Sequence, residues 1–317
     1  MKKPAYRAHR LVRSATGAMA AACIGLVAAP AFADLPRDQE ERGVYISLSG
    51  FRDRISNLDF RLASNAGSGE GARLEVGRGG EAMYQVGWLL PGRKGSVALT
   101  YWEYGETAGT NESAAGTPYA PTGFLDAVAN RSRIDAQVRI LARSVDAAYA
   151  REFKSAETFR ASWSLGLRYF RYEHLLKAEY FGSGELDHAF EQVESIGVGP
   201  RVGASFQYYF TPRWSLAAGT GLATLFGTSD HSNVSRTRFS TPSETVTFLE
   251  ERGTSRTFSQ ADLDIHMVFK AWRELEVSAG YRVSHWFDAR SRHLFTGEAE
   301  VERVTFDGPY LNVGYRF

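Results

Sequence analysis

Strict alternation of apolar and polar residues characterises the carboxy-terminal stretch, Asp307–Phe317. Side chains of a β-strand point alternately to opposite faces of a sheet. One face of this stretch carries Leu311, Val313, Tyr315 and Phe317, and the other carries Tyr310, Asn312, Gly314 and Arg316. The pattern predicts a strand with one apolar and one polar face, and the rest of the chain decides which face meets water.

Nine further stretches alternate in the same way, so ten strands are predicted. Each has about 9 to 15 residues, enough to cross a bilayer when tilted. In chain order they are Gly43–Phe51, Ala82–Leu90, a stretch through Val97 and Tyr101, one through Val145 and Tyr149, Phe159–Tyr169, Ile196–Phe210, Trp214–Phe226, Asp262–Lys270, Leu275–Ser284 and the tail. After residue 33, no stretch offers the roughly 20 apolar residues of a membrane helix.

The predicted connections alternate between short and long. Short turns follow the second, fourth, sixth and eighth strands, as at Thr211–Arg213, whereas long polar loops such as Gly105–Arg131 and Thr228–Arg256 follow the odd-numbered strands. Outer-membrane barrels have this asymmetry between periplasmic turns and external loops. A soluble sandwich gives no reason for it to persist along the chain.

The aromatic residues indicate which face meets lipid. On the apolar face they gather near the short turns, as expected of an interfacial girdle: Trp88, Phe153, Phe159, Phe210, Trp214, Phe269 and Phe317. The opposite face is rich in Gly, Ser and charged residues, which would be costly in a dry core. We therefore predict an all-β fold, a single transmembrane antiparallel up-and-down barrel of about ten strands, with eight to twelve possible, short periplasmic turns and long external loops.

The first 33 residues form a separate segment. Five basic residues precede an apolar stretch, Gly17–Ala29, and Ala31–Ala33 is an A-x-A cleavage site, so we expect a signal peptide cleaved after Ala33. Its removal lowers the formal charge from +1 to −4, which does not favour nucleic-acid binding. It also removes Cys23, the one cysteine, so no disulfide or cysteine metal site is expected. The predicted domains are thus the signal peptide, a short periplasmic segment at 34–42 and the barrel at 43–317.

Two hairpin regions resemble a known family. Gly197–Tyr209 with the following Trp214–Gly219, and Leu275–Trp286, are similar to the Legionella-type major outer membrane protein family. The resemblance implies an outer-membrane location in a Gram-negative bacterium and a pore or surface role. The expected partners are outer-membrane lipid, lipopolysaccharide and the barrel assembly machinery. The resemblance provides no catalytic residues, and no cofactor is expected.

Charged residues on the polar face are the main candidates for function. The residues predicted to line the lumen are Arg160, Arg168, Arg201, Asp262, Asp264, Lys270, Glu276 and Arg282, together with Asp146 and Glu152. In one interpretation they set the selectivity of a pore for ions or small solutes. In the other they pair with one another and close the lumen, since barrels of about eight strands are filled by side chains. The sequence leaves both open, and a non-conducting structural or adhesive barrel is the alternative function.

Other candidates are less specific. Asp187-His188 and Asp230-His231 are predicted in outer loops, where they could serve a surface hydrolase, but neither pair has a third group at a defined spacing. His266 beside Asp264 is expected to form lumen hydrogen bonds rather than to bind metal. The loop segment Thr117–Asn130 could fold into the barrel mouth as a lid or remain a plain surface loop. We therefore predict a protein that is not an enzyme.

The aromatic carboxy terminus generates a testable prediction. Leu311, Val313, Tyr315 and Phe317 resemble the ending that the assembly machinery reads in outer-membrane proteins. Deletion of Phe317 is expected to impair membrane assembly more than any conductance of the protein that is assembled. Heat-modifiable gel mobility of membrane fractions measures assembly, and normal insertion of the truncated chain would contradict the prediction.

Overall fold

A computed structural model describes residues 43–56, 60–61, 63–65, 73–74, 76–77, 79–91, 95–113, 119–121, 132–155, 158–182, 185–238, 244–293 and 299–317. The predicted signal peptide, its cleavage site and the segment 34–42 lie outside these residues, as does most of the candidate lid. Among the described residues, no helix is long and apolar enough to cross a membrane.

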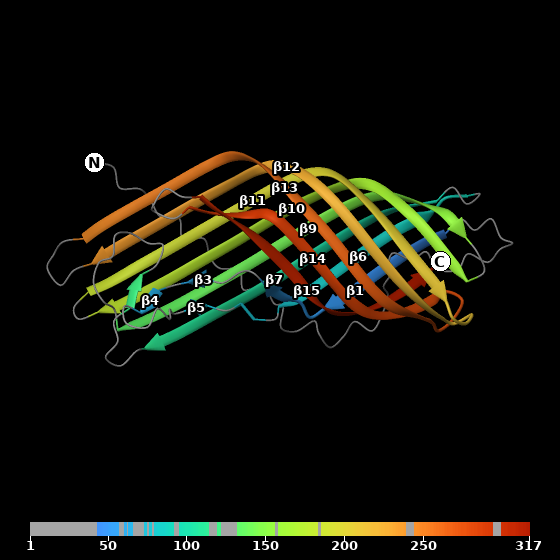
Figure 1. The fold of residues 1–317 in the computed structure, drawn as a ribbon, viewed down its shortest axis with the longest axis horizontal. Coiled ribbons are helices and arrows are strands. Elements are labelled where there is room, and N and C mark those ends of the chain that lie inside the picture. Colours follow the sequence, from blue (N-terminus) through green and yellow to red (C-terminus); the bar gives the residue numbers. More distant parts are fainter. Residues whose placement is uncertain are drawn as a thin grey trace.

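Ten long strands of the described chain lie side by side in a ring and are tilted relative to the long axis of the barrel (Figure 1). They are β1 (Gly43–Phe51), β6 (Gly80–Leu89), β7 (Ser96–Ser113), β9 (Arg133–Ser155), β10 (Phe159–Gly182), β11 (Glu185–Tyr209), β12 (Trp214–Arg238), β13 (Glu244–Lys270), β14 (Leu275–His293) and β15 (Ala299–Arg316). Each pairs antiparallel with its sequence neighbours in the ring, which confirms the predicted fold class.

The tail closes the barrel. β15 pairs with β1 over seven residues, from Tyr45 opposite Arg316 to Phe51 opposite Tyr310. Closure satisfies the backbone groups that a free edge would expose to lipid. Five short strands supplement the ring: β2 (Arg54–Ser56) pairs with β15, β3 (Phe60–Arg61) with β5 (Arg73–Leu74), and β4 (Ala63–Asn65) with β8 (Tyr119–Pro121).

The strand ends next to the short turns carry an exposed apolar band. In β10 the outward side chains Trp163, Leu165, Leu167 and Tyr169 are all exposed. Their inward neighbours are Ser162, Ser164, Gly166 and Arg168. At the edge of the band next to the short turns, five of the predicted girdle residues are also exposed: Trp88, Phe153, Phe210, Trp214 and Phe317. We call this part the membrane half, because such a band is stable against lipid and not against water.

The two faces of the strands exchange character beyond the apolar band. In β10 the change falls between Tyr169 and Phe170: the inward residues become apolar and buried, as at Tyr172 and Leu176, and the outward ones become charged, as at Arg171 and Glu173. We call this part the outer half. Its sides are those of a water-soluble barrel, polar outside and apolar inside.

The exchange of faces overturns the predicted loop boundaries. β7 continues to Ser113, β12 continues to Arg238 and β13 begins at Glu244, so much of Gly105–Arg131 and Thr228–Arg256 is strand rather than loop. Those residues were predicted as polar loops because the prediction expected apolar side chains on the outward face, as in the membrane half, whereas their outward side chains are polar. Apolar and polar residues continue to alternate past this point, but the apolar residues now lie on the inward face and the polar residues on the outward face.

The outer half has a packed hydrophobic core. Its buried members include Tyr104, Val138, Ile140, Tyr180, Leu225 and Val304, all at most 1% exposed, and Ile55, Leu74 and Val76 pack against the same cluster from the segment that follows β1. Among the described residues the strand ring is interrupted at this level, since β6 begins only at Gly80 and β13 pairs with β14 only from Ser259 to Lys270. Side-chain packing therefore contributes to holding the outer half together where ladder hydrogen bonds between these strands stop.

Two adjacent leucines on β10 test the exchange of faces. Leu176 is 2% exposed in the core, whereas Leu175 points outward. Leu176→Ala is expected to lower the free energy of unfolding by about 2–5 kcal/mol, because it leaves a cavity, and Leu175→Ala by less than about 1 kcal/mol. Urea unfolding of refolded protein in micelles measures both. Equal losses would mean that the outer half lacks a packed interior.

Candidate functional site in the lumen

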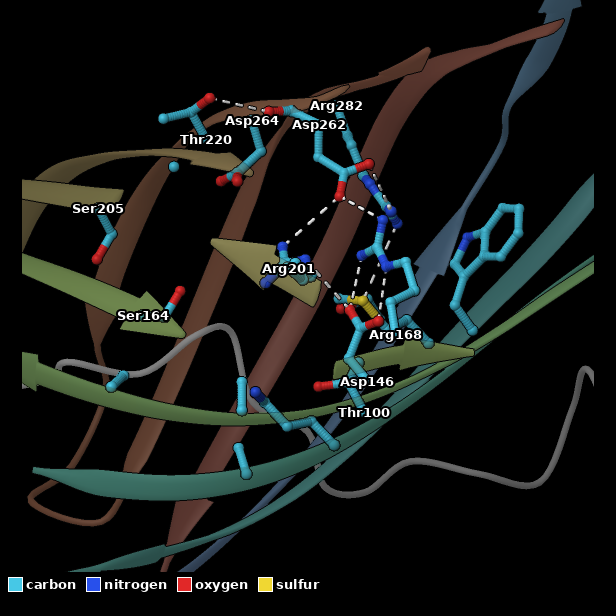
Figure 2. Close-up of a pocket in the computed structure, with 18 of the residues that line it drawn as sticks. Thr100, Asp146, Ser164, Arg168, Arg201, Ser205, Thr220, Asp262, Asp264 and Arg282 are labelled. Carbon is cyan, nitrogen blue, oxygen red and sulfur yellow. Dashed lines mark hydrogen bonds and ion pairs between the residues drawn. The ribbon is translucent and has the colours of Figure 1, made fainter. Parts of the chain in front are cut away.

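A buried ion-pair cluster lies where the polar lumen meets the apolar core (Figure 2). Arg168, 3% exposed, donates from Nε and Nη2 to the two carboxylate oxygens of Asp146, both at 2.6 Å. Its Nη1 donates to Asp262 at 2.8 Å and to Gln260 at 3.0 Å. This bidentate geometry is the strongest form of an arginine–carboxylate contact, and it joins β9, β10 and β13 across the lumen.

Arg282 extends the cluster to the opposite wall. Its guanidinium lies 3.3 Å from Glu81 and 3.9 Å from Asp262, over the rings of Phe51 and Trp102 at 5.5 and 5.7 Å. Glu81 also accepts a hydrogen bond from the indole N–H of Trp102. Glu81 was missed by the sequence prediction, which began this strand at Ala82. Met83, Gln85 and Gly87 were assigned to the inward face, and the residue two positions before Met83 is Glu81. Continuing the alternation by one more residue pair would therefore have identified it.

Arg201 is the least constrained of the three guanidinium groups. Its ion-pair distances are 3.5 Å to Asp146 and 3.6 Å to Asp262, and its Nε has no hydrogen-bond partner in the described structure. The side chain lies against Gly203 and Gly221, which are cross-strand partners. A Cβ on Gly221 would lie 2.7 Å from Nη2, so glycine at this position provides the room that Arg201 occupies.

The other predicted lumen charges lie closer to the short turns. Asp264 contacts His266 Nδ1 at 2.9 Å, which agrees with the predicted hydrogen-bonding role of His266. Arg160 lines a small cavity with Glu152 and stacks on the ring of Tyr209 at 5.5 Å. Lys270 and Glu276 are cross-strand partners at the end of β13 and the start of β14. Of the predicted charges, the structure therefore brings together Arg168, Arg201, Arg282, Asp146 and Asp262, and it leaves Arg160, Glu152, Asp264, Lys270 and Glu276 outside the central cluster.

An aromatic layer covers the cluster on its outer side. Trp102 lies 5.3 Å from both Trp286 and Phe306, and Phe170 lies 4.7 Å from Trp286 and 5.3 Å from Phe258. These five rings come from β7, β10, β13, β14 and β15, and each is at most 2% exposed. We call them the aromatic layer. Sequence reasoning missed it because a single polar face was assumed along the whole lumen.

A cavity occupies the lumen on the other side of the cluster. It has a volume of about 170 Å³ and extends toward the short turns, with small or polar walls that include Ser49, Ala98, Thr100, Ser144 and Ser164. Arg168, Arg201 and Arg282 line it at the cluster (Figure 2). We call this cavity the vestibule.

The two acid–histidine pairs considered for a hydrolase are separated by strand geometry. They lie in β11 and β12, not in loops, so neighbouring residues point to opposite faces. Asp187 and His231 are buried, whereas His188 contacts Glu179 at 3.4 Å and Asp230 accepts a hydrogen bond from the Gly253 amide at 2.6 Å on the outside. Neither pair forms an acid–base dyad.

Alternation instead brings His231 beside other buried groups. Glu191 Oε1 lies 3.7 Å from His231 Nε2 and 3.4 Å from His174 Nε2, inside the outer half. Within the described part of the chain, no group of three or more histidine, cysteine or acidic side chains has the arrangement of a metal site.

Arg168 provides the stability test of the cluster. Arg168→Ala leaves Asp146 with only a 3.5 Å contact to Arg201 and removes the shortest ion pair of Asp262, which keeps Ser284 and the longer contacts to Arg201 and Arg282. We therefore expect a loss of about 3–5 kcal/mol in unfolding free energy, mainly because the Asp146 carboxylate is left buried without a close partner. Arg273→Ala, in an exposed turn, is the matched control and is expected to change stability by less than about 0.5 kcal/mol. Guanidinium unfolding followed by tryptophan fluorescence measures both. A loss for Arg168→Ala as small as the control's would show that the pairs do not stabilise the barrel.

Comparison with known proteins places the chain in a family. Residues 97–317 match the model of the Legionella pneumophila major outer membrane protein precursor. Among solved structures, the outer membrane protease OmpT of Escherichia coli aligns with 8% identity and a TM-score of 0.49 over 87% of this chain and 97% of that one. A major outer membrane protein of Thermus thermophilus aligns with 11% identity and a TM-score of 0.35, covering 87% and 99%.

OprG of Pseudomonas aeruginosa aligns with 10% identity and a TM-score of 0.32, covering 87% of this chain and 96% of that one. No curated protein matches the sequence. The family match spans well over half of the chain and includes both hairpin regions that carried the resemblance. The chain therefore belongs to the Legionella pneumophila major outer membrane protein family and is an outer-membrane β-barrel.

Proposed function

We propose that the protein is a structural outer-membrane barrel that is closed to ions and displays its outer half at the cell surface. The observation that carries this proposal is the aromatic layer, whose five rings fill the lumen beyond the ion-pair cluster. Beyond it the core of the outer half continues with residues such as Tyr172 and Leu176. The proposal therefore adopts the alternative function that the sequence left open, a non-conducting structural or adhesive barrel, over the pore.

The energetics of the two layers support closure. An ion that leaves water for an apolar layer loses its hydration without gaining partners, at a cost of at least several kcal/mol. The cluster next to it holds Arg168 by four short hydrogen bonds, so the charge of Arg168 is already paired. Ten strands also enclose little more space than the eight that side chains fill.

The surface of the outer half supports exposure to water. Its outward charges form cross-strand pairs, with Arg143 3.0 Å from Glu103 and Arg171 3.0 Å from Glu194. Pairs of this kind add little stability but keep a strand face soluble. The outer half is therefore the part of the chain that contacts lipopolysaccharide and external partners in this proposal, whereas assembly of the barrel depends on the tail.

Passive passage of ions or small solutes is the second candidate function. It is favoured by the vestibule, a cavity with charged, hydroxyl and small apolar side chains on its walls that extends through the membrane half toward the short turns. Conduction would require the aromatic layer to move aside, because the vestibule ends at Arg168 and Trp102.

Planar-bilayer recording of purified, refolded protein distinguishes the two candidates. The wild-type chain is expected to give no discrete conductance steps, and a Trp102→Ala, Trp286→Ala, Phe306→Ala variant is expected to give small ones, because it removes three rings of the aromatic layer. Leu165→Ala, Leu167→Ala, Tyr169→Ala on the lipid face is the matched control and should remain silent. Reproducible conductance of the wild-type protein would refute a closed barrel and favour the passive pore.

A further inference from the structure

The charges around the vestibule leave one carboxylate without a cationic partner. Each of the three guanidinium groups at its closed end can be matched with a carboxylate that it contacts: Arg168 with Asp146, Arg201 with Asp262 and Arg282 with Glu81. Asp264 also lines the cavity, and within the described part of the chain it forms no ion pair with an arginine or a lysine. It contacts His266 Nδ1 at 2.9 Å, and a neutral imidazole donates this hydrogen bond without balancing the charge. One unit of negative charge therefore remains on Asp264.

Asp264 ends a row of cross-strand partners on the vestibule wall. Ser162 of β10 lies opposite Ser205 of β11, Ser205 lies opposite Gly219 of β12, and Gly219 lies opposite Asp264 of β13. All four residues line the cavity, where Figure 2 shows Ser205 and Asp264. A Cβ on Gly219 would lie 2.5 Å from Asp264 Oδ1, so the carboxylate uses the room that glycine leaves. The row thus has a carboxylate at one end, two hydroxyls at the other and no side chain between them.

The polar atoms of this row are hydrogen-bond acceptors. The Ser162 and Ser205 hydroxyls lie 2.6 Å apart, so one donates to the other. A hydroxyl has one proton and two lone pairs, so the pair keeps lone pairs for a further donor, and a carboxylate only accepts. Neighbouring strands are about 4.8 Å apart, which separates the backbones of Ser205 and Asp264 by roughly 10 Å. A small donor between them can reach both ends of the row.

Aromatic rings and small side chains form the walls nearby. The Tyr310 hydroxyl interacts with Asp264, so this ring lies beside the carboxylate, and the Phe51 ring lies 5.1 Å from it. Both rings line the vestibule, and aromatic faces attract cations. Ala148 and Ala204 line it as well, and its volume of about 170 Å³ is comparable to that of a cavity that holds benzene.

A primary ammonium group meets these conditions, because it carries one positive charge and three N–H donors. We infer that the vestibule binds a small organic primary amine in its ammonium form. The ammonium lies between Asp264 and the two serine hydroxyls, and the apolar part lies among the alanine and aromatic side chains. The inference does not depend on whether the barrel conducts.

Calorimetric titration of refolded protein in uncharged micelles tests the site, with benzylammonium as probe and benzyl alcohol as its uncharged analogue. The titrations are run at about pH 8, where free histidine is uncharged. Benzylammonium is expected to bind the wild-type protein, and benzyl alcohol to bind roughly tenfold or more weakly, because it lacks the charge-assisted hydrogen bonds. A titration of empty micelles gives the correction for partitioning. Absence of benzylammonium binding, or equal binding of benzyl alcohol, would overturn the proposal.

Three variants separate the site from general attraction of cations. Asp264→Asn is expected to weaken benzylammonium binding by roughly tenfold or more, whereas Glu274→Gln, at an exposed turn, should bind like the wild type. A Ser162→Ala, Ser205→Ala variant keeps Asp264 and should weaken binding by roughly threefold or more, so the test survives if Asp264→Asn does not fold. Heat-modifiable gel mobility verifies the fold of each variant. Undiminished binding in folded Asp264→Asn or in the serine variant would place the cation elsewhere and refute the site.

Discussion

The buried guanidinium of Arg168 is the contact on which the interior of this barrel depends. It is held by carboxylates on the neighbouring strand β9 and on the more distant strand β13, at 2.6 and 2.8 Å, and such a charge is tolerated away from water only when its partners are fixed. These short contacts set the distance between β10 and the facing part of β13. The diameter of the lumen at this level is therefore determined by side-chain chemistry as well as by strand number.

The aromatic layer is attached to this cluster through its indole groups. Trp102 donates to Glu81, and Trp286 donates to the Ser284 hydroxyl at 2.8 Å, which in turn donates to Asp262 at 2.7 Å. The polar ends of both indoles thus face the charges while their rings face the core. This orientation is the one that amphipathic aromatic side chains adopt at a boundary between wet and dry regions. Cluster and layer together act as one boundary between vestibule and core.

The membrane half was predictable from the sequence because its alternation has one consistent sense. β1 begins and ends at the predicted Gly43 and Phe51, and the tail pairs with it as expected. The outer half was not predictable in the same way, since a pattern with charged outward residues resembles a loop when the apolar face is assumed to point outward. Individual charges of the lumen were recognised, but their pairing was not. Arg168 and Asp262 are 94 residues apart, so only the register around the whole ring brings them together.

The reversal at Tyr169 and Phe170 also bears on how the strands find their register. In a barrel with one uniform pattern, a slip by one residue turns the apolar face from lipid to lumen. Here the same slip would in addition turn the buried Tyr172 and Leu176 outward and carry Arg171 and Glu173 into the core. A slipped strand would thus be destabilised in both halves: in the membrane half by polar residues facing lipid, and in the outer half by charged residues facing the core. A long strand that crosses two solvents therefore specifies its own alignment more strongly than two short strands of either kind.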